Sequence, residues 1–288
     1  MTGLALGLVL VSAFVHASWN FLLKKSGGGT GLVAAASALS LAVYAPLVLA
    51  TTWWQGYHFA PMHLALAFGS GMIHTAYFLL LDRAYRSGGD LSIVYPLARA
   101  TGPLLTIAVA VLALGERPGG MALAGAVLIG VSALVLTGNP FSRSRHGARG
   151  AVAFALMTGC MISIYTLWDK TSVAVYLVPP LLYDWTCNLC RVTVLVPWTA
   201  HRVPGAMAVA WREQRLTVVA IAVLSPLSYI LVLTAMVFTP VSLVAPAREV
   251  SILFAALMGA HLLREGDVVR RAVAATGMAL GIAGLALG

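Results

Sequence analysis

Charged residues are scarce in this 288-residue sequence. Lys, Arg, Asp and Glu together make up 9% of it, whereas soluble domains carry about a quarter. Cysteine is also rare, and the three residues present, Cys160, Cys187 and Cys190, give no disulfide framework. The shortage of charge excludes an ordinary soluble domain.

Apolar residues make up most of the sequence. Hydrophobic residues make up 60% of the chain, and its mean hydropathy is +0.92. A membrane-spanning helix needs about 20 such residues. The sequence therefore predicts an all-α integral membrane protein with ten transmembrane helices, multi-pass in a plasma membrane of the bacterial inner-membrane type. The candidate spans are residues 3–23, 31–53, 61–82, 91–114, 119–138, 150–168, 179–198, 216–238, 241–263 and 268–287.

The net charge of +9 comes from arginines and lysines scattered over short loops, so we expect a lipid bilayer and no nucleic acid as the partner. Loops after the odd-numbered spans hold thirteen of the 18 basic residues, loops on the other face hold two, and three lie within spans. This bias alone places the odd loops in the cytoplasm and both termini outside.

A repeat divides the chain into halves. Residues 91–99 read LSIVYPLAR and residues 241–248 read VSLVAPAR, so Arg99 and Arg248 are 149 positions apart. Glu116 and Glu265 have the same separation. The interpretation is a first five-helix repeat over 1–138, a linker at 139–149 and a second five-helix repeat over 150–288. An odd number of crossings inverts the second repeat, and inverted repeats usually enclose a central cavity.

Each repeat places an arginine inside an apolar span. Arg99 lies eight residues into its span, about 12 Å deep at 1.5 Å per residue. A charge at such depth costs about 2.5–3.5 kcal/mol on insertion scales, so it needs a partner or a watery cavity. The first half offers Arg99 no mid-span carboxylate, which leaves Glu249, Asp184 or a ligand as its counter-charge.

Helical spacing gathers further polar and aromatic residues on single faces of seven spans, as around a shared chamber. The candidate substrate-binding residues are Arg99, Arg248, Arg191, Tyr95, His16, Trp19, Asn20, His74, Tyr77, Tyr165, Trp168, Asn188 and Tyr229. Glu249 and Asp184 are candidates for proton coupling or for internal ion pairs. Trp168 and Tyr165 lie near a span end, where an aromatic belt is the competing interpretation. The pairs Asp169-Lys170 and Glu116-Arg117 fit solvated caps or gate pairs at span ends.

These motifs, in this order, resemble the EamA-domain permeases of the drug/metabolite transporter superfamily. The resemblance rests on residues 16–20 (HASWN), 95–99 (YPLAR), 115–117 (GER), 165–170 (YTLWDK) and 239–249, and it covers essentially the whole chain. It implies a ten-helix basket with spans 5 and 10 outside a central cavity, and secondary transport of small organic solutes. The family usually keeps its termini in the cytoplasm, contrary to the charge bias.

The resulting hypothesis is a secondary transporter that works by alternating access on a small anionic or zwitterionic organic solute bearing a phosphonate, phosphate or carboxylate. Arg99 and Arg248 would clamp the acidic group, because guanidinium offers paired donors in a planar fork. The alternative is an exporter of amino acids or amphipathic metabolites, with the arginines paired internally. No cofactor or metal is expected, and the chain could be a monomer or a homodimer.

Two other classes compete with transport. A membrane enzyme acting on lipid head groups could use His16 and His74 as acid and base, but no nucleophile–base spacing or phosphate-binding glycine loop accompanies them. A scaffolding or signalling subunit would need an exposed interaction domain. The sequence predicts neither class.

Overall fold

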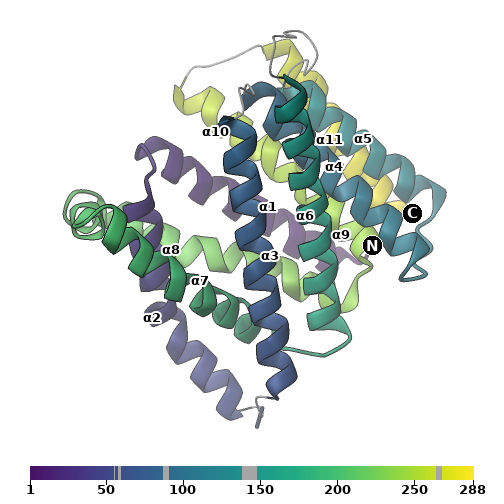
Figure 1. The fold of residues 1–288 in the computed structure, drawn as a ribbon. Coiled ribbons are helices and arrows are strands. Elements are labelled where there is room, and N and C mark those ends of the chain that lie inside the picture. Colours follow the sequence, from purple (N-terminus) through teal and green to yellow (C-terminus); the bar gives the residue numbers. More distant parts are fainter. Residues whose placement is uncertain (55, 58–59, 87–90, 138–147, 264–267) are drawn as a thin grey trace.

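The computed structural model describes residues 1–54, 56–57, 60–86, 91–137, 148–263 and 268–288. Over these residues the chain consists of helices and their connections, with no strand. The helices are α1 (Gly3–Lys25), α2 (Thr30–Trp54), α3 (Pro61–Arg86), α4 (Leu91–Leu112), α5 (Gly120–Thr137), α6 (Ala148–Ala174), α7 (Pro180–Arg202), α8 (Ala206–Phe238), α9 (Val241–Arg248), α10 (Val250–Leu263) and α11 (Val268–Leu287). Figure 1 shows them crossing one another in a bundle in which both termini lie close together.

The helices differ in how well they suit a bilayer. Among the described residues six segments are long and apolar enough to cross a membrane: 3–25, 30–54, 61–81, 152–174, 206–238 and 241–258. Three shorter apolar stretches lie in α4, α5 and α11, at 97–112, 120–135 and 272–287. Helix α7 belongs to neither set, because Asp184, Asn188 and Arg191 lower its hydropathy. An all-helical architecture with several potential membrane spans is therefore established.

Two of the predicted spans differ markedly in their bounds from the helices of the structure. Helix α6 continues to Ala174, six residues past the expected end of its span at 168. Helix α8 begins ten residues before the expected start at 216, and an elbow at Gln214 (φ −135°, ψ 33°) divides it. The extra turns of α6 matter for the site, since they carry Asp169 into the interior.

The span expected over 241–263 is broken into α9 and α10. Pro246 has no N–H and cannot continue the hydrogen-bond ladder of α9. The chain tightens into a turn in which the Glu249 N–H bonds to the Pro246 carbonyl at 3.0 Å. The break places Arg248 and Glu249 at the junction, so both side chains leave the backbone within the interior.

Packing joins the N-terminal and C-terminal halves throughout the molecule. The closest helix pairs are α5 with α11, α4 with α6, α1 with α8, α3 with α6, α2 with α8, and α2 with α7. The largest core cluster draws Val9, Ile107, Ile129, Tyr183 and Leu233 from both halves. The two halves therefore share one core and cannot be described as separate globules.

Candidate functional site

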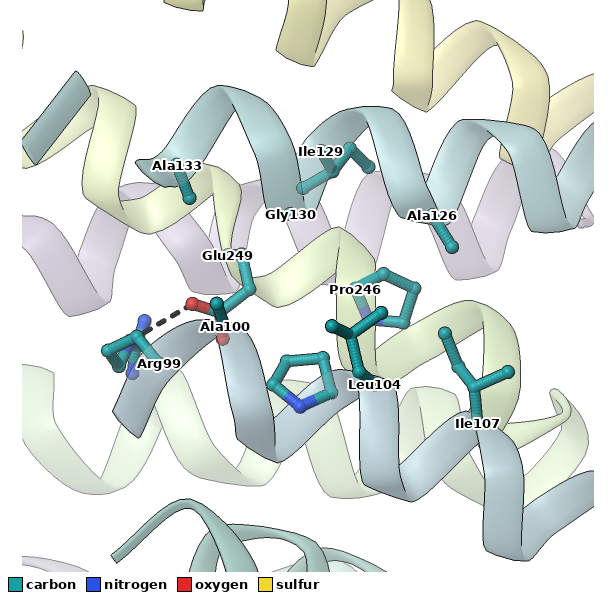
Figure 2. Close-up of a pocket in the computed structure, with 11 residues that line it drawn as sticks. Arg99, Ala100, Leu104, Ile107, Ala126, Ile129, Gly130, Ala133, Pro246 and Glu249 are labelled. Atoms are coloured by element: carbon teal, nitrogen blue, oxygen red, sulfur yellow. Dashed lines mark ion pairs between the residues drawn. The ribbon is translucent and has the colours of Figure 1, made fainter. Parts of the chain in front are cut away.

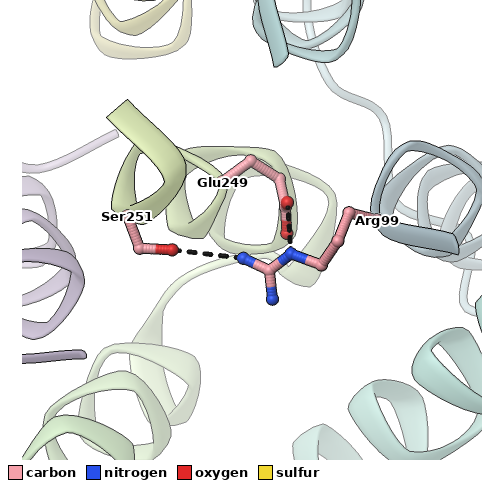
Figure 3. Close-up of polar contacts among 3 residues, drawn as sticks. All are labelled: Arg99, Glu249 and Ser251. Carbon is pink, nitrogen blue, oxygen red and sulfur yellow. Dashed lines mark hydrogen bonds and ion pairs between the residues drawn. The ribbon is translucent and has the colours of Figure 1, made fainter. Parts of the chain in front are cut away.

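The charged centre of the molecule begins with an ion pair between α4 and the α9–α10 junction. Arg99 Nε lies 3.0 Å from Glu249 Oε2, and both side chains are largely buried, with 16% and 7% of their surfaces exposed. Arg99 Nη2 also donates to Ser251 Oγ at 3.1 Å. Figure 3 shows the guanidinium lying between Glu249 and Ser251. Of the counter-charges that the sequence left open for Arg99, the structure uses Glu249.

Arg248 is adjacent in sequence but is held differently. Its guanidinium carbon lies 5.5 Å from the centroid of the Tyr229 ring on α8, a cation–π arrangement. Among the residues described, no carboxylate lies within ion-pair distance of Arg248. One arginine of the repeat pair is thus neutralised by a carboxylate, whereas the other rests on an aromatic face.

Asp169 is the polar hub of the interior, with a fully buried side chain. Its carboxylate accepts hydrogen bonds from Ser70 Oγ (2.7 Å) on α3 and from Tyr183 Oη (2.6 Å) on α7. A third bond comes from Tyr229 Oη on α8. One carboxylate on α6 therefore ties three other helices together.

Sequence reasoning missed Asp169, because it placed the residue beyond the end of its span as part of a solvated Asp-Lys pair. The signal that could have found it is helical spacing: Tyr165, Asp169 and Ser172 lie at i, i+4 and i+7, on one face of a helix that continues to Ala174. Ser70 and His74 show the same i, i+4 spacing on α3.

Aromatic side chains lie beside the hub. The His74 ring stacks on Tyr165 with centroids 4.2 Å apart and meets Tyr229 edge to face at 5.9 Å. His74 Nδ1 lies 2.9 Å from the Ser70 carbonyl oxygen and 3.2 Å from Ser70 Oγ. Tyr77 meets Tyr165 edge to face at 5.9 Å. Tyr165 itself interacts electrostatically with Arg248, Arg99, Glu249 and Asp169, so the ion pair, the second arginine and the hub form one cluster.

Three predicted residues of α1 lie near this cluster or along the same helix. His16 interacts electrostatically with both Arg99 and Arg248. Trp19 meets His16 edge to face at 5.1 Å and also packs on the apolar cluster of α2 and α8. The Asn20 amide donates to the His16 carbonyl oxygen at 2.8 Å, within its own helix. Of the three, His16 is the one within electrostatic range of the charged centre.

The predicted residues of α7 form a separate polar stripe. Asn188 donates to the Ser37 carbonyl oxygen (3.0 Å) and to Ser40 Oγ (2.7 Å), which fastens α7 to α2. Asp184 is buried and interacts electrostatically with Arg191 and Asp169. Arg191 is half-buried and also acts on His74. The stripe therefore lies within electrostatic range of the hub without contacting Arg99 in the structure.

Trp168 and Tyr95 complete the predicted set. The Trp168 indole N–H donates to the Leu66 carbonyl oxygen at 2.8 Å, so this residue braces α6 against α3. The side chain of Tyr95 lies outside the described residues.

The connection between α8 and α9 is held by one charge from each half of the chain. Lys170 Nζ donates to the Met236 (2.6 Å) and Thr239 (3.0 Å) carbonyl oxygens at the end of α8. The Glu116 carboxylate accepts from the Val241 and Ser242 N–H groups at the start of α9, both at 2.9 Å. A cation at a helix C-terminus and an anion at an N-terminus both suit the helix dipole.

A small pocket borders the ion pair between α4, α5 and α9 (Figure 2). Arg99 and Glu249 close one end of it, and Pro246, Leu104, Ile107 and Ile129 supply apolar walls. It is too small to hold an organic solute, since ligand pockets usually measure hundreds of cubic ångströms. The described residues contain no group of three or more His, Cys, Asp or Glu that could hold a metal ion.

Comparison with known proteins shows a shared fold. No protein-family model matches the sequence, and no curated protein matches it either. A solved structure titled "Crystal structure of protein" superposes with a TM-score of 0.76 over 98% of this chain and 97% of that chain, at 15% sequence identity. The arrangement of helices is therefore one that a solved structure also adopts, from end to end.

Proposed function

We propose that this protein is a membrane-embedded secondary transporter of a small organic solute that carries an acidic group, alone or together with an amine. The observation that carries the proposal is the cluster of Arg99, Glu249, Arg248 and Asp169 inside an otherwise apolar helical bundle. Ionisable groups are costly at such positions and usually mark a substrate or ion path. The cost of burying these ionisable groups fits a protein that must bind a charged solute.

The pattern of helix packing supports two inverted repeats. If α1 to α5 correspond to α6, α7, α8, α9–α10 and α11, each packed pair should recur with its members exchanged. The α1–α8 pair corresponds to α6–α3, the α2–α8 pair to α7–α3, and the α4–α6 pair to α1–α10, and all of these pairs are packed. The α2–α7, α4–α9 and α5–α11 pairs correspond to themselves, as a two-fold axis requires.

Within this frame the acidic group of the solute would meet Arg248 first. Arg99 already has Glu249 and Ser251 as partners, whereas Arg248 rests on a ring and keeps its planar fork for a ligand. An amine on the same solute would compete with Arg99 for Glu249. Binding of a zwitterion could thus exchange one internal ion pair for two ligand contacts without leaving a buried charge alone.

Alternating access would create the space that the small pocket lacks. In this arrangement Lys170 and Glu116 hold the α8–α9 connection closed on one side. Inverted repeats allow one bundle to rock against the other around a fixed site. The closed centre corresponds, in this proposal, to an occluded or unloaded conformation.

The rival within transport is an exporter of amino acids or amphipathic metabolites. The observation that favours it is the Arg99–Glu249 pair itself, because an internally neutralised arginine needs no anionic ligand. The two proposals differ in the solute that should stabilise the protein.

Three matched solutes separate the proposals: 2-aminoethylphosphonate, ethylphosphonate and ethylamine, which present both charged groups, the acid alone or the amine alone. Thermal unfolding of the purified protein in detergent should shift upward with the first or second solute and not with ethylamine. Arg248→Gln should abolish the shift, while Arg212→Gln, a change at an exposed position of α8, should retain it. Stabilisation of the wild type by tryptophan amide alone, unchanged in Arg248→Gln, would support the exporter and contradict the anion site.

A further inference from the structure

We propose that Tyr229 and Asp169 act as a positioning pair that sets the Arg248 guanidinium in place for the acidic group of the solute. The inference deepens the transport proposal, on which it rests, by assigning roles to a carboxylate and a phenol that have no direct part in ligand contact. It joins three side chains from three helices, α9, α8 and α6.

The contacts link Asp169 to Arg248 through Tyr229. Tyr229 donates its hydroxyl proton to Asp169 Oδ2, and the face of its ring receives the Arg248 guanidinium, 5.5 Å from the centroid. Donation to a carboxylate increases the electron density of a phenol ring, which strengthens cation–π attraction. The same bond fixes the position of the hydroxyl end of the ring, because it is anchored at a side chain that is itself fully buried.

Asp169 can serve as an anchor because two other buried side chains also donate hydrogen bonds to its carboxylate. Its other carboxylate oxygen accepts from Ser70 and Tyr183, and both of these residues are fully buried. The carboxylate is therefore bonded from several sides, whereas Arg248 has its cation–π contact, among the residues that the structure describes, with the Tyr229 ring.

Tyr183 supplies a matched control for Tyr229. Both tyrosines donate one hydrogen bond to the same carboxylate, and both belong to the same apolar cluster. Only Tyr229 carries Arg248 on its ring. Tyr229→Phe and Tyr183→Phe thus remove the same kind of bond from Asp169, and they differ in whether a guanidinium depends on it.

The test measures the rate at which phenylglyoxal modifies Arg248, followed by peptide mass spectrometry, with inorganic phosphate as the protecting anion. We expect Tyr229→Phe to raise the rate about fivefold, the factor that corresponds to one hydrogen bond, and to weaken protection by phosphate similarly. Tyr183→Phe should leave both quantities within about twofold of wild type, although it lowers thermal stability as much.

Equal labelling rates in the two tyrosine variants would overturn the inference, since Asp169 would then be only a structural hub. Should Tyr229→Phe not fold, Asp169→Asn answers the same question: it keeps an acceptor oxygen for Tyr229 but removes the charge, and an Arg248 rate equal to wild type would contradict the pairing. The labelling rate requires no transported solute. Absence of solute binding with a normal difference between the tyrosine variants would sink the transport proposal and leave the positioning pair intact.

Discussion

Helices α5 and α11 meet through glycine, whereas α4 meets the α9–α10 junction, and α6 meets α8, through charged and hydroxyl side chains. At the first contact a Cβ added to Gly125 would lie 2.5 Å from the Gly281 carbonyl oxygen, so the two backbones leave no room for a side chain. In the charged centre Arg99 pairs with Glu249, and Tyr229 donates a hydrogen bond to Asp169, in each case across helices. Close packing between small residues has essentially one arrangement, while an ion pair can trade one partner for another.

The contrast suggests a division of labour. The α5–α11 seam contains apolar and small residues on the α11 side from Ala272 to Leu287 and fits a scaffold that stays fixed. The charged centre lies beside a broken helix, where hydrogen bonds of the backbone are already interrupted. Substitutions in the two regions test whether stability and solute binding depend on different residues.

The largest effect is expected at the ion pair. Glu249→Gln removes one charge of a buried pair and leaves Arg99 without its carboxylate, which should lower the free energy of unfolding by about 3–5 kcal/mol. Thermal unfolding in detergent measures the loss. The double variant Arg99→Met with Glu249→Leu should recover most of the stability, because neither charge of the pair remains, but it should no longer respond to 2-aminoethylphosphonate. Full recovery of the ligand response would mean that the pair belongs to the scaffold.

A smaller but still clear effect is expected in the seam. Gly125→Ala should destabilise the protein by about 1–3 kcal/mol, since the new methyl group overlaps the backbone of α11. Gly130→Ala on the same helix is the control, because a Cβ there meets nothing within 4 Å. Unfolding temperatures of the two variants give the comparison. If the seam is scaffold alone, the affinity for a stabilising solute should be the same in both variants.

Glu116→Gln should cost less, about 1 kcal/mol, because the amide keeps one acceptor oxygen and loses the second bond and the charge at the start of α9. Its larger consequence should be on conformation. Since Glu116 helps to hold the α8–α9 connection, its loss should raise the reactivity of a cysteine introduced at Ser242, whose side chain is buried. Arg117→Gln, an exposed neighbour, should change neither quantity. Unaltered reactivity in Glu116→Gln would show that Glu116 does not hold the α8–α9 connection closed.

Much of the helical order could be predicted from hydropathy, because each apolar run is long and the connections are short. The break at Pro246 and the neighbourhood of Arg99 and Glu249 also follow from local rules, since proline interrupts a helix and a buried arginine needs an anion. The sequence alone could not identify which carboxylate pairs with Arg99. Glu249 rather than Asp184 meets Arg99 because of how α4 crosses the α9–α10 junction, which is a property of packing.

Asp169 and Lys170 show the limit most clearly. Adjacent opposite charges at the end of an apolar run are typical of a solvated cap, and the local sign of a continuing helix is the spacing of Tyr165, Asp169 and Ser172. In the structure the two side chains separate, Asp169 into the interior and Lys170 onto the carbonyl groups of α8. The stabilising partners come from α3, α7 and α8, and no single helix of the sequence displays them together.

The smallest predicted effect concerns Trp168, which lies where the two regions of the molecule are hardest to tell apart. Its position near Tyr165 suggested a wall of the substrate site, but its indole N–H bonds to the Leu66 carbonyl oxygen and its ring fills the space above Gly69, where a Cβ would approach it to 2.6 Å. Trp168→Phe keeps an aromatic ring and removes the hydrogen bond, so stability should fall by about 0.5–1.5 kcal/mol. Solute-dependent stabilisation should be unchanged if the residue is a brace between α3 and α6. A reduced response to 2-aminoethylphosphonate with unchanged stability would instead assign Trp168 to the charged centre and would move the boundary between the two regions toward α3.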